Sequence, residues 1–151
     1  MKKHLLYLPL LLMFLSCKRF MFHPNEIRPQ EKALNARNIE KIKALPPKQT
    51  FNFILLGDTQ RFYDEVDDFI DHVNASDSIS FVLIAGDLVD FGLNKEYNWI
   101  AEKFGRLKIP YVAVIGNHDM LANGRKIFAE MFGPENFSFN YSGNKFILLN
   151  T

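Results

Sequence analysis

Three oxygen-bearing side chains in this sequence of 151 residues stand in the same local context and at nearly equal intervals. Asp58, Asp87 and Asn117 each follow a glycine that ends an apolar run, and they lie 29 and then 30 residues apart. If the apolar runs are neighbouring strands of an open α/β sheet, the residues just past their carboxyl ends converge on one crevice. Two ionised aspartates at close range repel one another unless a cation lies between them. The pattern therefore predicts a metal site.

The types of these side chains indicate the class of metal. Carboxylate and amide oxygens, with His118 one position beyond Asn117, favour Mn, Fe, Zn or Mg over a soft metal that requires thiolates. The single cysteine, Cys17, lies far away in the sequence. A plainer interpretation is that each Asp or Asn caps the helix that follows it. For any one residue helix capping would be preferred. Because all three residues have the same local context, a shared metal site is favoured.

Parallel strands joined by helices are needed to bring these residues together. The apolar runs at 51–56, 81–85 and 111–115 predict strands that are buried on both faces. The segments 63–74 and 94–104 carry apolar residues on one helical face, so each strand pair forms a β-α-β unit of about 30 residues. We expect an α/β fold whose sheet begins parallel, with helices flanking it.

The periodicity changes after a third helical stretch, 124–132. Residues 137–142 alternate between aromatic and polar side chains, which predicts a strand with one wetter face. Gly143-Asn144 can supply the positive φ angles of a tight hairpin turn, and residues 146–149 then return as the next strand.

Three short motifs at the predicted strand ends resemble those of the calcineurin-like metallophosphoesterases. They are Asp58-Thr59-Gln60, Gly86-Asp87-Leu88-Val89-Asp90 and Gly116-Asn117-His118-Asp119, with 25 residues between each consecutive pair. The family's pattern is D-x-H, G-D-x-x-D and G-N-H-D/E at about this spacing. The resemblance covers 51–151 and implies a two-sheet sandwich flanked by helices, two divalent or trivalent metal ions and a phosphoester substrate.

The resemblance also implies a role for each motif residue. Asp58 would bind the first metal, Asp87 would bridge both metals and Asn117 would bind the second. His118 would give a proton to the leaving group, and Asp90 and Asp119 would lie behind the metal ligands, where either side chain could hold the tautomer of His118. In this scheme two such cations would lower the pKa of a water molecule between them and so supply the hydroxide that attacks phosphorus.

Gln60 departs from the family's pattern, which has histidine there as a ligand to the first metal. Glutamine is a neutral oxygen donor, so we expect a retained site that prefers a harder metal. The pattern's later lone His and G-H-x-H do not occur in these 151 residues. We therefore expect residues 50–151 to be the N-terminal half of a metallophosphoesterase domain from a longer chain, and to be inactive alone.

The first sixteen residues have the layout of a signal peptide. Lys2 and Lys3 precede an apolar run at 5–15. Eleven residues at about 1.5 Å each cannot cross a bilayer core of ~30 Å, so cleavage after residues 1–16 is favoured over a permanent span.

Cys17 follows this run in a context that resembles the lipobox of bacterial lipoproteins. We expect lipidation of Cys17, a tether over 17–49 that includes a short helix within 30–45, and a membrane-anchored protein facing the periplasm or the exterior. The alternative is a secreted protein cut nearby. Without residues 1–16 the chain has 16 basic and 17 acidic side chains, so we expect no binding to nucleic acid.

Two other function classes compete with the hydrolase. One is a lipid-anchored binding protein of the same fold that has lost catalysis, and Gln60 is the residue that supports it. The other is a different α/β phosphate-handling domain, such as a receiver or a haloacid-dehalogenase-like fold. The haloacid-dehalogenase-like fold requires D-x-D after its first strand, whereas this sequence has Asp58-Thr59-Gln60. Neither the receiver fold nor the haloacid-dehalogenase-like fold predicts Gly-Asn-His-Asp after the third strand.

Overall fold

The computed structural model describes residues 23–150, so the expected signal peptide at 1–16 and the expected lipidation site Cys17 lie outside the described residues. Along the chain the elements are α2 (Leu34–Ala44), β1 (Asn52–Leu56), α3 (Tyr63–Asn74), β2 (Ile79–Ile84), α4 (Asn94–Phe104), β3 (Tyr111–Ala113), α5 (Gly124–Met131), β4 (Phe137–Tyr141) and β5 (Asn144–Leu148). Within residues 23–150 no helix has the length and apolar character needed to cross a membrane.

The strands β1, β2 and β3 pair in that order as a parallel sheet, which confirms the expected α/β class. Helices α3 and α4 are the connections between them, as parallel neighbours require. Both helices begin and end at the residues expected from the apolar periodicity. β3 is shorter than expected and ends at Ala113, although the N–H of Val114 still donates to the carbonyl of Ile84 at 3.0 Å.

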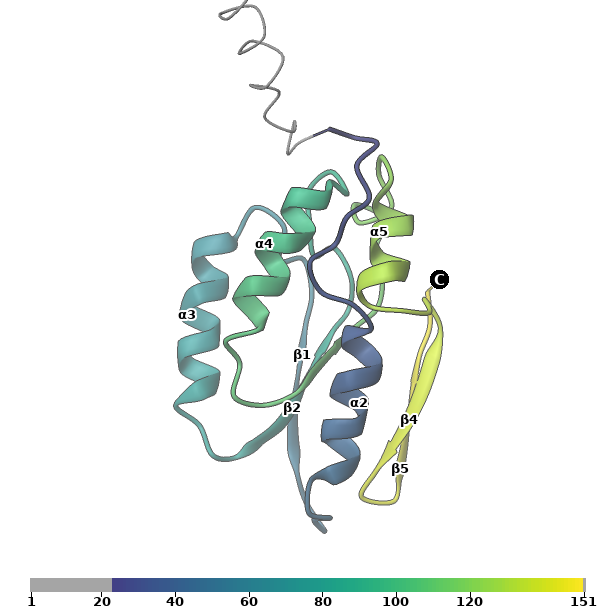
Figure 1. Ribbon diagram of the computed structural model, residues 1–151. Helices are drawn as coiled ribbons and strands as arrows, with labels where there is room; N and C mark the ends of the chain where they lie inside the picture. The colour runs from purple at the N-terminus through teal and green to yellow at the C-terminus, as the bar shows by residue number, and fades with distance from the viewer. Residues whose placement is uncertain (1–22, 151) are drawn as a thin grey trace, which may run out of the picture.

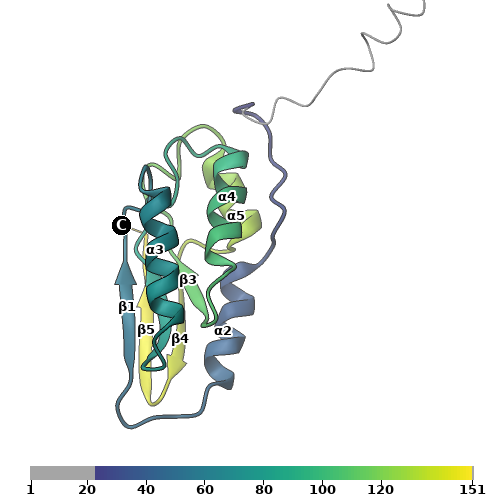
Figure 2. The same ribbon diagram turned by 90° about the vertical axis from the view of Figure 1, so that its left-hand side faces the viewer.

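Both faces of the sheet are buried, and successive residues of β2 point to opposite faces. Val82 and Ile84 pack with α3, α4 and α5, whereas Phe81 and Leu83 pack with the hairpin of β4 and β5. Figures 1 and 2 show the same layering, with α3 and α4 on one side of the sheet and the hairpin on the other. The continuous apolar run in β2 follows from this double burial.

The antiparallel hairpin of β4 and β5 is a second layer of strands against the first sheet. Phe139 and Tyr141 place their rings edge-on to Phe81, with ring centroids 5.9 and 5.7 Å away. The turn falls one residue earlier than expected. Ser142 (φ 48°) and Gly143 (φ 79°) are its positive-φ residues, and β5 already begins at Asn144.

Helix α2 lies within the stretch 30–45, where a short helix is expected, and it packs against the free edge of β3. The Asn35 side chain accepts a hydrogen bond from the backbone N–H of Ala113 at 2.9 Å and donates one to its carbonyl at 2.8 Å. Leu34 and Ile42 are buried in the two clusters on either face of the sheet. The helix thus satisfies an otherwise unpaired strand edge.

Candidate functional site

The three loops that follow β1, β2 and β3 meet at the carboxyl end of the sheet. The N–H groups of Asp58 and Gln60 donate to the carbonyls of Gly86 and Asp87, at 3.4 and 3.1 Å. The N–H of His118 donates to Oδ1 of Asp87 at 3.0 Å. The structure therefore brings the three predicted motifs together, with Asp87 bonded to both neighbours.

The approach of these loops depends on glycine. A β carbon at Gly116 would lie 2.3 Å from the backbone nitrogen of Asp87, and one at Gly86 would lie 2.8 Å from the Cα of Gly116. Asp58 (φ 54°) and Asp87 (φ 51°) are themselves in the left-handed region. For residues other than glycine this conformation costs about 1–3 kcal/mol, and such strain concentrates at functional sites.

The four predicted metal ligands are placed unequally. Asp58 and Asn117 are exposed, and their side chains make no hydrogen bond to another residue of the described chain. Asp87 is half-buried and uses one carboxylate oxygen for the N–H of His118. Asp58 and Asn117 therefore offer their oxygens freely, whereas Asp87 offers chiefly the second oxygen.

Gln60 provides a test of whether a cation fits here. Its Oε1 is buried and has no hydrogen-bond partner within residues 23–150. A buried acceptor without a partner costs about 1–3 kcal/mol, and a hard cation would satisfy it. No three His, Cys, Asp or Glu side chains of the described residues form a metal-holding group. A cation at this place would depend on two carboxylates and two amide oxygens, a donor set that fits Mg²⁺ or Mn²⁺.

His118 has a defined tautomer. Its Nδ1 lies 3.0 Å from the backbone carbonyl oxygen of Asp90. A carbonyl only accepts hydrogen bonds, so Nδ1 must carry a proton and Nε2 is the atom left for chemistry. The expectation that a carboxylate of Asp90 or Asp119 holds this ring is wrong, because the partner is the main chain of Asp90.

The Asp90 carboxylate instead ties the first loop to the second. It accepts a hydrogen bond from the Tyr63 hydroxyl at 2.8 Å and forms an ion pair with Arg61 at 3.3 Å. Burial and the neighbouring Asp90 carboxylate raise the pKa of Tyr63 well above its usual range. The sequence did not predict a role for Tyr63 at the site, because there Tyr63 is only the first residue of an expected amphipathic helix.

Asp119 fixes the second loop to the third from within the core. It is fully buried, and its two carboxylate oxygens accept hydrogen bonds from the N–H groups of Val89 (2.9 Å) and Gly116 (2.8 Å). Burial raises the pKa of Asp119 to about 7, against the opposing effect of these bonds. Its backbone carbonyl accepts the hydroxyl of Tyr97 at 2.9 Å. Asp119 therefore holds the second and third loops together from the buried side of the site.

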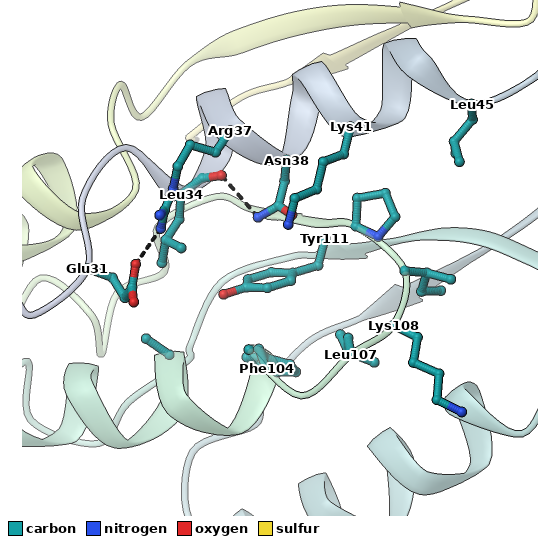
Figure 3. Close-up of a pocket in the computed structure, with 14 residues that line it drawn as sticks. Glu31, Leu34, Arg37, Asn38, Lys41, Leu45, Phe104, Leu107, Lys108 and Tyr111 are labelled. Atoms are coloured by element: carbon teal, nitrogen blue, oxygen red, sulfur yellow. Dashed lines mark hydrogen bonds and ion pairs between the residues drawn. The ribbon is translucent and has the colours of Figure 1, made fainter.

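A cavity of about 440 Å³ lies away from these loops, between α2 and the connection from α4 to β3. Figure 3 shows Tyr111 between Asn38 of α2 above and Phe104 below. Tyr111 begins β3, whereas Asn117 lies beyond its end, so the cavity and the candidate site are at opposite ends of the strand. The cavity is separate from the predicted chemistry.

Comparison with known proteins agrees with this geometry. The family model of the calcineurin-like phosphoesterases matches residues 51–150. A probable cyclic nucleotide phosphodiesterase of Xenorhabdus bovienii is 29% identical over 68 residues, which are 45% of this chain and 28% of that protein. A probable cyclic nucleotide phosphodiesterase of Moraxella catarrhalis is 47% identical over 38 residues, 25% of this chain and 14% of that protein.

The matched part of this chain thus spans less than a third of either curated relative. No solved structure gives a significant match. The family match covers about two thirds of the chain and includes all three motifs whose loops meet at Asp87. This chain belongs to the calcineurin-like phosphoesterase family.

Proposed function

We propose that this chain is part of a metal-dependent phosphoesterase that hydrolyses a phosphomonoester or a phosphodiester. The observation that carries the proposal is the meeting of three loops around Asp87, with the buried oxygen of Gln60 left without a partner in the described chain. Membership of the family supports phosphoester hydrolysis as the chemistry. The names of two relatives make cyclic nucleotides a candidate substrate.

Asp58, Gln60, Asp87 and Asn117 are the residues that would hold the cations. All four offer oxygen, which favours Mg²⁺ or Mn²⁺ over Zn²⁺ or Fe. Cations held by these residues would supply a Lewis acid for the phosphoryl oxygens and a nucleophile at neutral pH. Asp58 and Asp87 both have a left-handed backbone conformation, and their loops are hydrogen-bonded to each other at this edge of the sheet.

His118 would protonate the leaving oxygen through Nε2. Its Nδ1 proton is committed to the carbonyl of Asp90, so Nε2 carries a proton only when the ring is the imidazolium cation. Once Nε2 has given up its proton, the ring is neutral and keeps the same hydrogen bond. The Asp90 carbonyl therefore orients the ring before and after proton transfer.

Hydrolysis of 4-nitrophenyl phosphate and bis(4-nitrophenyl) phosphate by the complete gene product tests this proposal. We expect Mn²⁺-dependent release of 4-nitrophenolate that Asp58→Asn removes. Asp77→Asn, which changes an exposed aspartate between α3 and β2, is the matched control and should retain activity. Activity that survives Asp58→Asn would refute the role of this residue.

A binding protein of the same fold is the second candidate, favoured by the observation that residues 23–150 bring together no three His, Cys, Asp or Glu side chains. Such a protein would bind a phosphorylated ligand without turning it over. Calorimetric binding of phenyl phosphate, with no phosphate released during long incubation with Mn²⁺, would establish this candidate over the hydrolase.

We also propose that the protein is exported and anchored by a lipid on Cys17, which residues 1–17 support by their basic start, apolar run and cysteine. Expression in a bacterial host with a labelled fatty acid should place label in the membrane fraction. Cys17→Ser should remove both the label and the membrane association. Membrane association without label would contradict the lipid anchor.

A further inference from the structure

Three large apolar side chains stand exposed beside the candidate site. Phe62, Phe91 and Leu121 expose 54%, 58% and 45% of their surface. One lies on each of the three loops that carry the candidate residues. Single exposed apolar side chains are ordinary on a protein surface, whereas several gathered around a polar site are typical of a ligand-binding surface.

Contacts of Asp90 hold the chain segments that carry Phe62 and Phe91 close to each other. Its carboxylate accepts the hydroxyl of Tyr63 at 2.8 Å and pairs with Arg61 at 3.3 Å. Arg61 and Tyr63 flank Phe62, and Asp90 directly precedes Phe91. Both phenylalanines therefore start from backbone segments that are fixed to each other.

Gly92 brings the third loop against the second. A β carbon at Gly92 would lie 2.2 Å from the carbonyl oxygen of Leu121, so the two backbones are in direct contact. Phe91 lies between Gly92 and Asp90, and the backbone carbonyl of Asp90 accepts a hydrogen bond from Nδ1 of His118 at 3.0 Å. The segment that carries Phe91 therefore contacts both the segment of Phe62 and the segment of Leu121, and its neighbour Asp90 contacts His118.

We infer that Phe62, Phe91 and Leu121, the apolar rim, bind a flat aromatic ring carried by the phosphoester substrate. The inference rests on the proposed function, because the phosphoryl group would lie at the candidate residues of these same three loops. Two phenyl rings favour a planar group, since aromatic side chains stack on flat rings without reading their hydrogen-bond pattern. Arg61 is already paired with Asp90, so the rim suits a neutral ring better than a second anionic group.

Calorimetric binding of two non-hydrolysable phosphonates to the Mn²⁺-loaded complete gene product tests the inference. Phenylphosphonate should bind about 5- to 100-fold more tightly than methylphosphonate, the range expected for one stacked ring. The double variant Phe62→Ala/Phe91→Ala should bind both equally, with the affinity for methylphosphonate unchanged. Ile147→Ala, which truncates an exposed apolar residue of β5, should retain the preference for the ring.

Hexylphosphonate separates a flat ring from a flexible chain. If it binds as tightly as phenylphosphonate, the claim of a planar group is overturned. Equal affinities for the phenyl and methyl ligands in the unaltered protein, or a preference that survives in the double variant, would overturn the rim itself. The readout is binding and not turnover, so a failure of the proposed hydrolysis would appear separately, as a retained preference for the ring without release of 4-nitrophenolate.

Discussion

Oδ1 of Asp87 accepts a hydrogen bond from the backbone N–H of His118 at 3.0 Å. The contact joins the loop after the middle strand to the loop that carries the candidate acid. One carboxylate oxygen therefore positions His118, and the other faces no hydrogen-bond donor among the described residues. The same side chain serves both the packing of the loops and the proposed cation.

Asp87→Asn should separate these two roles. The amide oxygen of Asn can still accept the N–H of His118, so the free energy of unfolding should stay within about 1 kcal/mol of the original. The lost charge should weaken Mn²⁺ binding strongly and abolish metal-dependent hydrolysis. Calorimetric titration with Mn²⁺ and a denaturant melt measure the two effects. Asp71→Asn, at an exposed position of α3, is the control. Unchanged Mn²⁺ affinity would refute Asp87 as a ligand.

Gln60→His should change the preference of the site among metals. Imidazole is a softer donor than an amide oxygen, so the variant should gain affinity for Zn²⁺ relative to Mg²⁺. Gln60→Ala should weaken the binding of either ion, because it removes the buried oxygen that has no other partner in residues 23–150. Metal content after dialysis against equal concentrations of both ions gives the ratio. The same ratio in all three proteins would mean that Gln60 contacts no metal.

His118→Asn should leave metal binding intact and slow turnover. The Asn amide can still donate to the carbonyl of Asp90, but it carries no transferable proton. General acid catalysis contributes about 10²- to 10⁴-fold, and we expect a loss of that size in kcat. His72→Asn on the exposed face of α3 is the control. A full rate in His118→Asn would remove His118 from the mechanism.

Asp119 should make stability fall as pH rises. Burial raises its pKa from 3.8 to about 7 in the folded chain. Between these values the folded chain keeps the proton and the unfolded chain loses it, so the free energy of unfolding should decrease from pH 4 to pH 7 by on the order of 4 kcal/mol. Denaturant melts of metal-free protein at these pH values measure the slope, which should be shallower in Asp119→Asn. Parallel slopes would contradict the raised pKa.

Asn35→Ala should destabilise the fold even though Asn35 lies outside the family match. The change removes both hydrogen bonds to Ala113 and leaves a buried N–H and carbonyl unpaired, which should cost about 2–4 kcal/mol. Lys41→Ala on the exposed face of α2 should cost far less. If Asn35→Ala melts at the same denaturant concentration as the unaltered protein, α2 does not stabilise the sheet.

The sequence allowed the layout of the sheet to be predicted because each part had a strong local signal. The apolar faces of α3 and α4 repeat at helical spacing, and β2 is apolar throughout because both of its faces are buried. The meeting of Asp58 and Asp87 followed from the rule that parallel strands end at one edge of a sheet. The 25-residue gaps between the motifs fit one crossover each.

Features that depend on contacts between distant residues could not be predicted from the sequence. Asn35 pairs with Ala113 across 78 residues, and nothing local distinguishes it from a surface asparagine of a tether. His118 is held by a main-chain carbonyl, which every residue possesses, so the sequence pointed instead to a nearby carboxylate. Tyr63 donates its hydroxyl to Asp90 from the start of helix α3. In each case the partner is defined by folding alone.

The most direct measurement is the rate at which the complete gene product hydrolyses bis(4-nitrophenyl) phosphate after EDTA treatment and again after Mn²⁺ is restored. We expect a rate that falls to background with EDTA and returns with Mn²⁺, but that does not return in either Asp58→Asn or Asp87→Asn. Hydrolysis that persists in EDTA, or that Mn²⁺ restores equally in both variants, would contradict a metal-dependent phosphoesterase built on these two aspartates.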